Sequence, residues 1–162
     1  MNNTKYFKLR IFLVSLFVSH FAFAQELKYE LLFEVKAVLD TPIRVGKTPL
    51  GTRSIHPVKS GTVEGPKIKG ELLPNGGDWL LTLDSTTAKL DVRAVIKTVE
   101  GEIIYISYSG FRHKNPDGTY NYRTNPIFET SSKKYDWLNY TIAVGVGRKI
   151  EGGLAYYIYA IK

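Results

Sequence analysis

The chain has 162 residues, of which 23% are charged and 44% are hydrophobic, and it contains no cysteine. This length suits one domain with a hydrophobic core that no disulfide crosslinks. The formal net charge of +7 falls to about +4 without the first 24 residues, and the other lysines and glutamates are interspersed. Such a modest excess is typical of a solvated surface, so we expect no nucleic-acid partner.

The first 24 residues have the pattern of an export signal. Lys5, Lys8 and Arg10 precede an apolar run over residues 11–21, and Ala22-Phe23-Ala24 fits the small-x-small rule for cleavage. We predict a signal peptide over residues 1–24, a single domain over residues 25–162 and a periplasmic or secreted protein. A retained anchor is the alternative, but the run is shorter than the ~20 apolar residues that span a membrane.

Segments of period two follow one another along the rest of the chain. Apolar and charged residues alternate from Leu27 to Ala37, which predicts a half-buried strand. Prolines and glycines punctuate residues 41–51, which are predicted as a loop. No 3.6-residue pattern is long enough for a helix of more than a turn or two. Further strands are predicted over residues 53–58, 67–73, 79–83, 87–99, 102–111, 122–130, 137–149 and 154–161.

Short strands joined by polar turns predict an all-β domain that hides its strand edges. A single antiparallel β-barrel of about 8–10 strands hides them most completely, and a two-sheet sandwich is the alternative. An outer-membrane barrel is disfavoured, because the first strand carries four charges on one face and Pro57 and Pro126 interrupt two others. We therefore expect no stable membrane insertion once the signal peptide is removed.

Several motifs spread from Gly51 to Arg148 resemble one family as a set. They are residues 61–79, Asp91-Val92-Arg93, residues 123–130 and residues 135–139. The chain resembles the family called domain of unknown function 3237 over nearly all of residues 25–162. This resemblance implies a β-barrel, but no reaction or ligand. Ala94 stands where a tyrosine is usual in the family, so the resemblance implies a different ligand here if that tyrosine lines a pocket.

Aromatic and polar side chains on the predicted strands are candidates for a ligand site. Asp91 and Arg93 lie two apart, so they share a face and either pair on the surface or line a cavity together. Arg123 is predicted to bind an anion, and a plain surface arginine is the alternative. The predicted ligand-binding residues are Trp79, Asp91, Arg93, Tyr105, Arg123, Tyr135, Trp137 and Asn139.

One face of the predicted strand near the C-terminus changes from large to small residues. Tyr135, Trp137 and Asn139 begin this face, and Gly145 and Gly147 end it. The face forms either the mouth and floor of a pocket or a place where glycines relieve crowding at a bend of the barrel.

A carboxylate that is buried beside a tyrosine has a raised pKa and can transfer protons. The candidates are Glu64, Asp91 and Glu129, with Tyr105 as the tyrosine. Exposure of all three carboxylates to water argues against this role. Asp78 follows Gly76-Gly77 and is interpreted as a turn residue that bonds its own backbone.

The sequence offers no pattern for a metal or a cofactor. Only His56 and His113 follow the signal, and neither has a histidine or thiol at ligand spacing. The chain has no cysteine nucleophile, no nucleophile elbow and no glycine cluster before a helix. We therefore expect neither a metal site nor a cofactor.

Three functions fit these observations. The first is an exported, soluble β-barrel that binds a small organic molecule, anionic ones included, in an aromatic-lined cavity. The second is a cofactor-independent isomerase or lyase on the same barrel, with a carboxylate and tyrosine acid–base pair. The third is a structural domain with no pocket. A cavity lined by the candidate residues separates the first two from the third.

Overall fold

The computed structural model describes residues 26–162, so the predicted signal peptide and its cleavage site lie outside the described residues. Within residues 26–162, no helix has the length and apolar character that crossing a membrane requires. The strands are β1 (Tyr29–Leu39), β2 (Ile43–Thr48), β3 (Gly51–Glu64), β4 (Lys69–Leu72), β5 (Gly77–Thr82), β6 (Thr87–Thr98), β7 (Ile103–Lys114), β8 (Tyr120–Glu129), β9 (Ala143–Ile150) and β10 (Gly153–Ile161), and the one 3-10 helix is η1 (Asp136–Tyr140).

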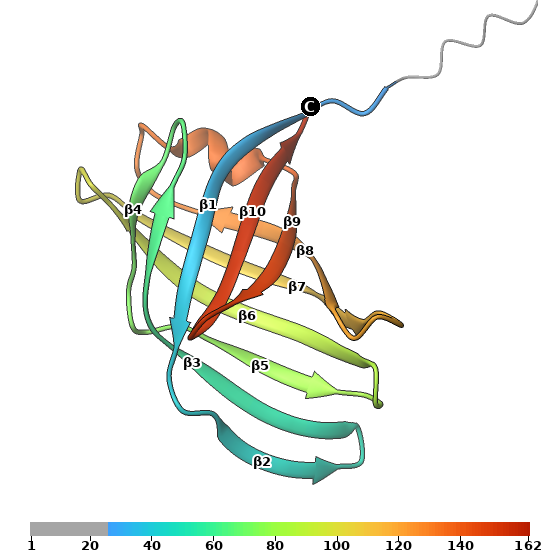
Figure 1. Ribbon diagram of the computed structural model, residues 1–162. Helices are drawn as coiled ribbons and strands as arrows, with labels where there is room; N and C mark the ends of the chain where they lie inside the picture. Colours follow the sequence, from blue (N-terminus) through green and yellow to red (C-terminus); the bar gives the residue numbers. More distant parts are fainter. Residues whose placement is uncertain (1–25) are drawn as a thin grey trace, which may run out of the picture.

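The strands close into an antiparallel barrel with eight positions around its wall (Figure 1). β1 pairs with β10 on one side and with β3 on the other, which closes the sheet. Between the long strands β3 and β6, one position is shared by β5 in one half and by β4 in the other. The predicted all-β, single antiparallel barrel is therefore confirmed.

Residues 43–48 form β2, where the sequence predicted only loop. β2 pairs with the first half of β3, from Ile43 opposite Ile55 to Thr48 opposite Gly51. The hydroxyl of Thr48 donates to the carbonyl of Gly51 at 2.8 Å, and Gly51 adopts a φ of 138° that favours glycine. The prolines and glycines here mark the bends around a hairpin, and the residues between them keep strand pairing.

The predicted strand over residues 137–149 begins only at Ala143, because η1 replaces its first part. Leu138 is buried in the core. The side-chain amide of Asn139 donates to the carbonyl of Thr130 at 3.0 Å, and its oxygen accepts from the amide of Thr130 at 2.8 Å. The side chain of Asn139 thus forms hydrogen bonds with the backbone N–H and C=O of Thr130, which a neighbouring strand would otherwise pair with. η1, the orange coil in Figure 1, covers the end of the barrel opposite β2.

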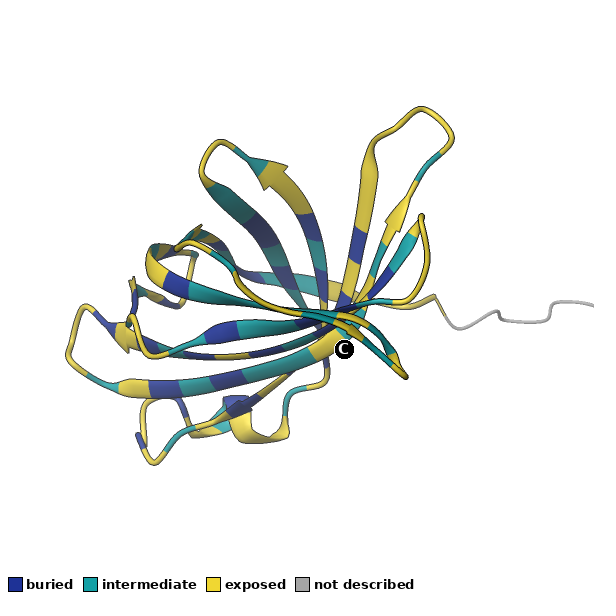
Figure 2. Ribbon diagram, turned by 90° about the horizontal axis from the view of Figure 1, so that it is seen from below, coloured by how far each residue is buried: buried dark blue, intermediate teal, exposed yellow. Residues whose placement is uncertain are grey.

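Buried residues alternate with more exposed ones along strands such as β6 and β8, and the coloured bands in Figure 2 show this alternation along several ribbons. On β6, the buried residues are Ala88, Leu90, Val92, Ala94, Ile96 and Thr98, and the residues between them lie on the outer face. Since successive side chains of a strand point to opposite faces, the apolar set fills the interior and the charged set meets water. The barrel interior is therefore apolar along most of its length.

The glycines of β9 make room for side chains from the neighbouring strands. A Cβ atom on Gly147 would lie 2.4 Å from the ring of Tyr156, and one on Gly145 would lie 2.2 Å from the hydroxyl oxygen of Thr124. Both distances are shorter than any normal contact between a Cβ atom and another heavy atom, so neither position has room for a side chain. This geometry fits the alternative that the glycines relieve crowding, with the ring of Tyr156 occupying the space that Gly147 leaves.

Candidate functional site

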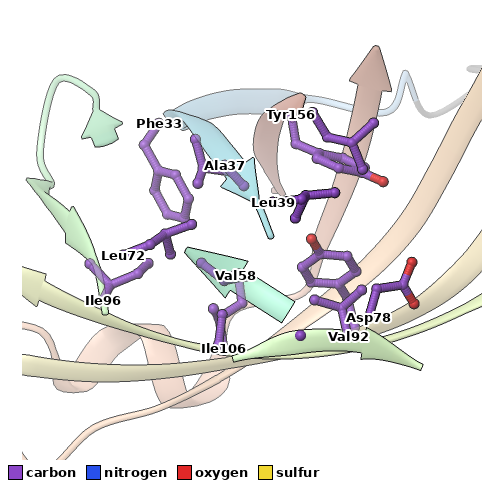
Figure 3. Close-up of a pocket in the computed structure, with 15 residues that line it drawn as sticks. Phe33, Ala37, Leu39, Val58, Leu72, Asp78, Val92, Ile96, Ile106 and Tyr156 are labelled. Carbon is purple, nitrogen blue, oxygen red and sulfur yellow. The ribbon is translucent and has the colours of Figure 1, made fainter. Parts of the chain in front are cut away.

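The centre of the barrel contains an apolar cavity, which measures about 580 Å³ including its open part (Figure 3). Its wall draws on opposite sides of the barrel, from β1 and β10 to β6 and β7. The polar side chains in this wall are one carboxylate and two phenols. The lining residues are Phe33, Val35, Ala37, Leu39, Val58, Leu72, Gly77, Asp78, Val92, Ala94, Ile96, Ile106, Tyr108, Leu154 and Tyr156.

The cavity continues into a wider and more polar space, here called the mouth. The two spaces share Leu39, Asp78 and Leu154, and the mouth measures about 990 Å³ including its open part. It lies at the end of the barrel where β1 leads into β2 and β9 turns into β10. Its polar lining residues are Asp40, His56, Asp78, Arg112, Tyr120, Tyr122 and Lys149.

Asp78 lies where the apolar cavity meets the mouth. Its Oδ1 atom accepts a hydrogen bond of 3.1 Å from the backbone N–H of Asp91 on β6. Burial raises the pKa of Asp78 to about 6, and the nearby negative charge of Asp91 adds to this increase. The interpretation of Asp78 as a turn residue is wrong, because its carboxylate bonds across the sheet and not to its own turn. Near neutral pH this carboxyl group can both accept and donate a proton.

Two tyrosines share the cavity wall with Asp78. The rings of Tyr108 and Tyr156 lie 5.6 Å apart between centroids, and that of Tyr122 lies 6.1 Å from Tyr156. Burial, followed by the charge of Asp78, raises the pKa of Tyr108. Burial also raises the pKa of Tyr156, well above its usual value. Both phenols therefore stay protonated and are hydrogen-bond donors at neutral pH. Figure 3 shows Asp78 and Tyr156 on one side of the cavity, away from Phe33 and Ile96.

The mouth carries an uncharged histidine next to an arginine. His56 lies directly opposite Asp78 in the pairing of β3 with β5, and its Nε2 atom is 3.0 Å from the hydroxyl oxygen of Ser54. Burial lowers the pKa of His56, and the positive charges of Arg112 and Arg44 lower it further. The histidine is therefore neutral at pH 7, and the positive charge of the mouth comes from Arg112 and Lys149.

The comparison with known proteins agrees with this architecture. A family model described as "Protein of unknown function (DUF3237)" matches residues 27–161. The chain belongs to this family. The resemblance expected from the sequence motifs is thereby confirmed. The match covers nearly all of the residues that the structure describes.

Relatives of this DUF3237 chain include proteins of known structure. A UPF0311 protein of Clostridium acetobutylicum is 30% identical over 153 residues, covering 85% of this chain and 96% of that protein. A β-barrel-like protein of Acinetobacter baumannii has a TM-score of 0.80 at 30% identity, covering 85% of this chain and 97% of its own. A protein described as an enzyme from Penicillium herquei has a TM-score of 0.69 at 20% identity, covering 84% and 95%, and shows the same fold.

The residues predicted from the sequence to bind a ligand do not line the cavity or the mouth of this DUF3237 barrel. Asp91 and Arg93 form an ion pair of 3.3 Å on the outer face of β6. The guanidinium of Arg93 lies 5.3 Å from the centroid of the Trp79 ring. Arg123 is exposed on β8, and its guanidinium donates to the backbone carbonyl of Tyr122 at 2.8 Å. The alternative of a surface ion pair is the geometry found for Asp91 and Arg93.

Three other candidates meet on the outside of the barrel. Tyr105 and Glu129 are cross-strand neighbours on β7 and β8, and together with Asn139 they line a shallow surface groove. Glu129 is exposed there. Glu64 is also exposed and lies 3.7 Å from Lys69. Since Asp91 is outside as well, none of the three candidate carboxylates reaches the cavity.

The aromatic candidates near η1 belong to the covered end of the barrel. The hydroxyl of Tyr135 donates to a carboxylate oxygen of Glu100 at 2.9 Å, and the ring is buried. Trp137 packs against the core, and the amino group of Lys67 lies 5.6 Å from its ring centroid. These contacts hold η1 over its end of the barrel. The mouth lies at the other end.

Asp78, Tyr108, Tyr156 and Arg112 are the site residues that the sequence analysis missed. A signal was present for two of them, because Tyr108 and Arg112 lie at even intervals from the apolar Ile104 and Ile106 and so share a face of the strand with them. A polar residue that continues an apolar face of a strand is a candidate for the interior. Among residues 26–162, no group of three or more His, Cys, Asp or Glu side chains is arranged to hold a metal ion.

Proposed function

We propose that this protein binds a small, largely apolar organic molecule inside the barrel, with the polar part of the molecule at the mouth. One observation carries the proposal: an apolar cavity in the barrel centre ends at Asp78, Tyr108 and Tyr156 and continues into an open mouth. Binding sites for small molecules are typically apolar hollows in which a few polar groups fix the orientation.

The physical cost of this arrangement supports a functional role. Protein interiors are normally packed as densely as organic crystals, so an unfilled space between the apolar side chains of this wall removes packing contacts. Placing a carboxyl group in its wall adds a desolvation cost, which the single hydrogen bond from Asp91 offsets only in part. A structural domain without a pocket has no use for either feature.

Native mass spectrometry of the purified protein tests the proposal, because a bound molecule adds its mass to that of the chain. The matched variants are Ala37→Phe, which fills the cavity from β1, and Val38→Phe, which adds the same ring to the outer face of the same strand. We expect the added mass to be lost in Ala37→Phe and kept in Val38→Phe. An added mass that survives in folded Ala37→Phe, or none in the wild type, contradicts binding in the cavity.

A second candidate function is proton transfer to or from the bound molecule. The observation that favours it is the carboxyl group of Asp78, whose pKa of about 6 is close to neutrality, in a wall shared with Tyr108 and Tyr156. Asp78 would remove a proton from carbon beside a carbonyl group, and a phenol would donate a hydrogen bond to the resulting oxyanion. This role replaces Glu64, Asp91 and Glu129, which lie outside the cavity.

Exchange of carbon-bound hydrogen for deuterium tests proton transfer directly. The copurified molecule, or a ketone that binds in its place, is incubated in D₂O and followed by NMR. We expect the protein to accelerate exchange, Asp78→Asn to abolish the acceleration while binding persists, and Glu129→Gln, on the outer face of β8, to leave it unchanged. Binding without accelerated exchange in the wild type limits the protein to a carrier or sensor.

We also propose that the mature protein is exported and free in solution. The support is the signal pattern in residues 1–24 together with the alternation on β6, where the charged side chains lie outside and the apolar ones inside. A barrel that crosses a membrane has the opposite arrangement, with an apolar band facing lipid. Fractionation of expressing cells tests this proposal, with the mature chain expected in the soluble periplasmic or extracellular fraction.

A further inference from the structure

The inner face of β7 ends in an arginine without an anionic partner. Arg112 follows Tyr108 and Gly110 on the same face of the strand and lines the mouth together with Asp78 and Lys149. Its Nε atom is buried and has no hydrogen-bond partner among residues 26–162. Of the ion pairs in this part of the chain, none includes Arg112, whereas the outer Arg93 pairs with Asp91.

A buried guanidinium N–H without an acceptor is costly, so its persistence requires an explanation. An unsatisfied buried donor loses the hydrogen bonds that it makes to water when exposed, and the loss is larger for a charged group. The ring of Tyr120, whose centroid lies 5.2 Å from the guanidinium carbon of Arg112, compensates part of the charge. The face of an aromatic ring does not accept the two parallel N–H bonds that a guanidinium can donate. The N–H groups of Arg112 can therefore still donate to a ligand.

The described groups around Arg112 do not accept hydrogen bonds from its guanidinium. His56 is neutral. The positive charge of Arg112 lowers the pKa of Asp78, but no hydrogen bond or ion pair joins these two side chains among residues 26–162, and the oxygen Oδ1 of Asp78 accepts from the backbone of β6. Lys149 on β9, which is separated from β7 only by β8, adds a second positive charge to the mouth wall. The remaining carboxylate of the mouth, Asp40, is exposed and accepts from the amide of Thr41 at 2.7 Å.

We propose that Arg112 binds a carboxylate group of the ligand, so that the ligand is an amphipathic monocarboxylate whose apolar body lies in the inner cavity. The inference rests on the proposed function and specifies its ligand class. A guanidinium fits a carboxylate with two parallel N–H···O bonds, and such charge-assisted bonds are the strong ones. The mouth and the cavity share Asp78, Leu39 and Leu154, so one molecule of this shape occupies both.

Titration calorimetry with octanoate and 1-octanol tests the ligand class, because the two probes share an apolar body and differ in the charged group. The variants are Arg112→Gln and, as a matched control on the outer face of the next strand, Arg123→Gln. We expect Arg112→Gln to weaken octanoate by ~10-fold or more and to leave 1-octanol unchanged. Arg123→Gln should change neither, and Arg112→Lys should recover part of the octanoate affinity.

The outcomes distinguish the two proposals. Octanoate that binds equally to wild type and Arg112→Gln overturns the role of Arg112 and leaves the cavity as a binding site. If Arg112→Gln and Arg112→Lys both fail to bind octanoate and 1-octanol, the proposal that Arg112 acts through its charge is likewise overturned. If neither probe binds the wild type and native mass spectra show no ligand, the proposed function itself fails.

Discussion

His56 and Asp78 are direct cross-strand partners on β3 and β5, and both side chains line the mouth of the barrel. Such an arrangement usually produces an ion pair, yet no ion pair joins them in the described part of the chain. Burial favours the uncharged form of both groups, and the charge of Arg112 lowers the pKa of the histidine further. The mouth therefore keeps a titratable carboxyl group and a free guanidinium side by side.

Asp78 should make the stability of the barrel depend on pH. Its pKa is about 6 in the folded protein and near 3.8 when unfolded, so the folded state binds its proton more tightly. The stability from this group is complete below about pH 4, falls as the pH rises, and is fully lost above about pH 6. Chemical unfolding should show a loss on the order of 3 kcal/mol over this range.

Asp78→Asn is the variant that isolates this effect, because the amide oxygen still accepts from Asp91 and carries no charge. We expect Asp78→Asn to remove the loss of stability between about pH 4 and 6 and to be more stable than the wild type at pH 8. Identical pH profiles for the two proteins would show that Asp78 is not desolvated in the folded state.

Tyr135→Phe should affect stability without affecting the ligand. The variant removes the 2.9 Å hydrogen bond to Glu100, which fixes η1 over the covered end of the barrel. We expect a loss of about 1 kcal/mol in the free energy of unfolding and no change in octanoate affinity. A large change in affinity would place the ligand at this end of the barrel instead of at the mouth.

Gly147→Ala should disturb the site through packing. The added Cβ would lie 2.4 Å from the ring of Tyr156, so the ring must move within the cavity wall. We expect a loss of roughly 1–3 kcal/mol in stability and weaker ligand binding, measured by unfolding and calorimetry. Val146→Ala, on the opposite face of the same strand, is the control and should leave ligand affinity unchanged.

Export predicts a defined N-terminus for the mature protein. Cleavage after Ala24 leaves a chain that begins with Gln25. Intact-mass measurement of protein from the periplasmic or extracellular fraction should give the mass of residues 25–162. A full-length chain recovered with the membrane fraction would contradict cleavage and support the alternative of a retained anchor.

Much of the barrel was predictable because strand alternation is a local property. The alternating set Ala88, Leu90 and Val92 on β6 identifies both the strand and its buried face without reference to any other segment. Two local errors have a common cause in contacts between separate segments of the chain, which period and propensity do not contain. Asn139 bonds to Thr130 and favours η1 over a strand, and β2 forms because β3 supplies a pairing edge.

The site was harder to predict, because the candidates were chosen by chemical type and not by face. Asp91, Arg93 and Arg123 have suitable groups, yet each lies on the charged face of its strand, which the closed barrel turns toward water. Asp78 continues a face that includes the buried Leu80, and Arg112 continues that of Ile104 and Ile106. Attention to these interruptions of apolar faces would have found them.

The sequence by itself determined the strands, their buried faces and the family, since each depends on residues that lie close together along the chain. Tertiary structure alone decided which polar groups meet. Asp78 from β5, Tyr108 and Arg112 from β7 and Tyr156 from β10 come together only because the pairing of β1 with β3 closes the wall. Closure removes these side chains from water, and that loss of solvent gives Asp78 a pKa that no local pattern encodes.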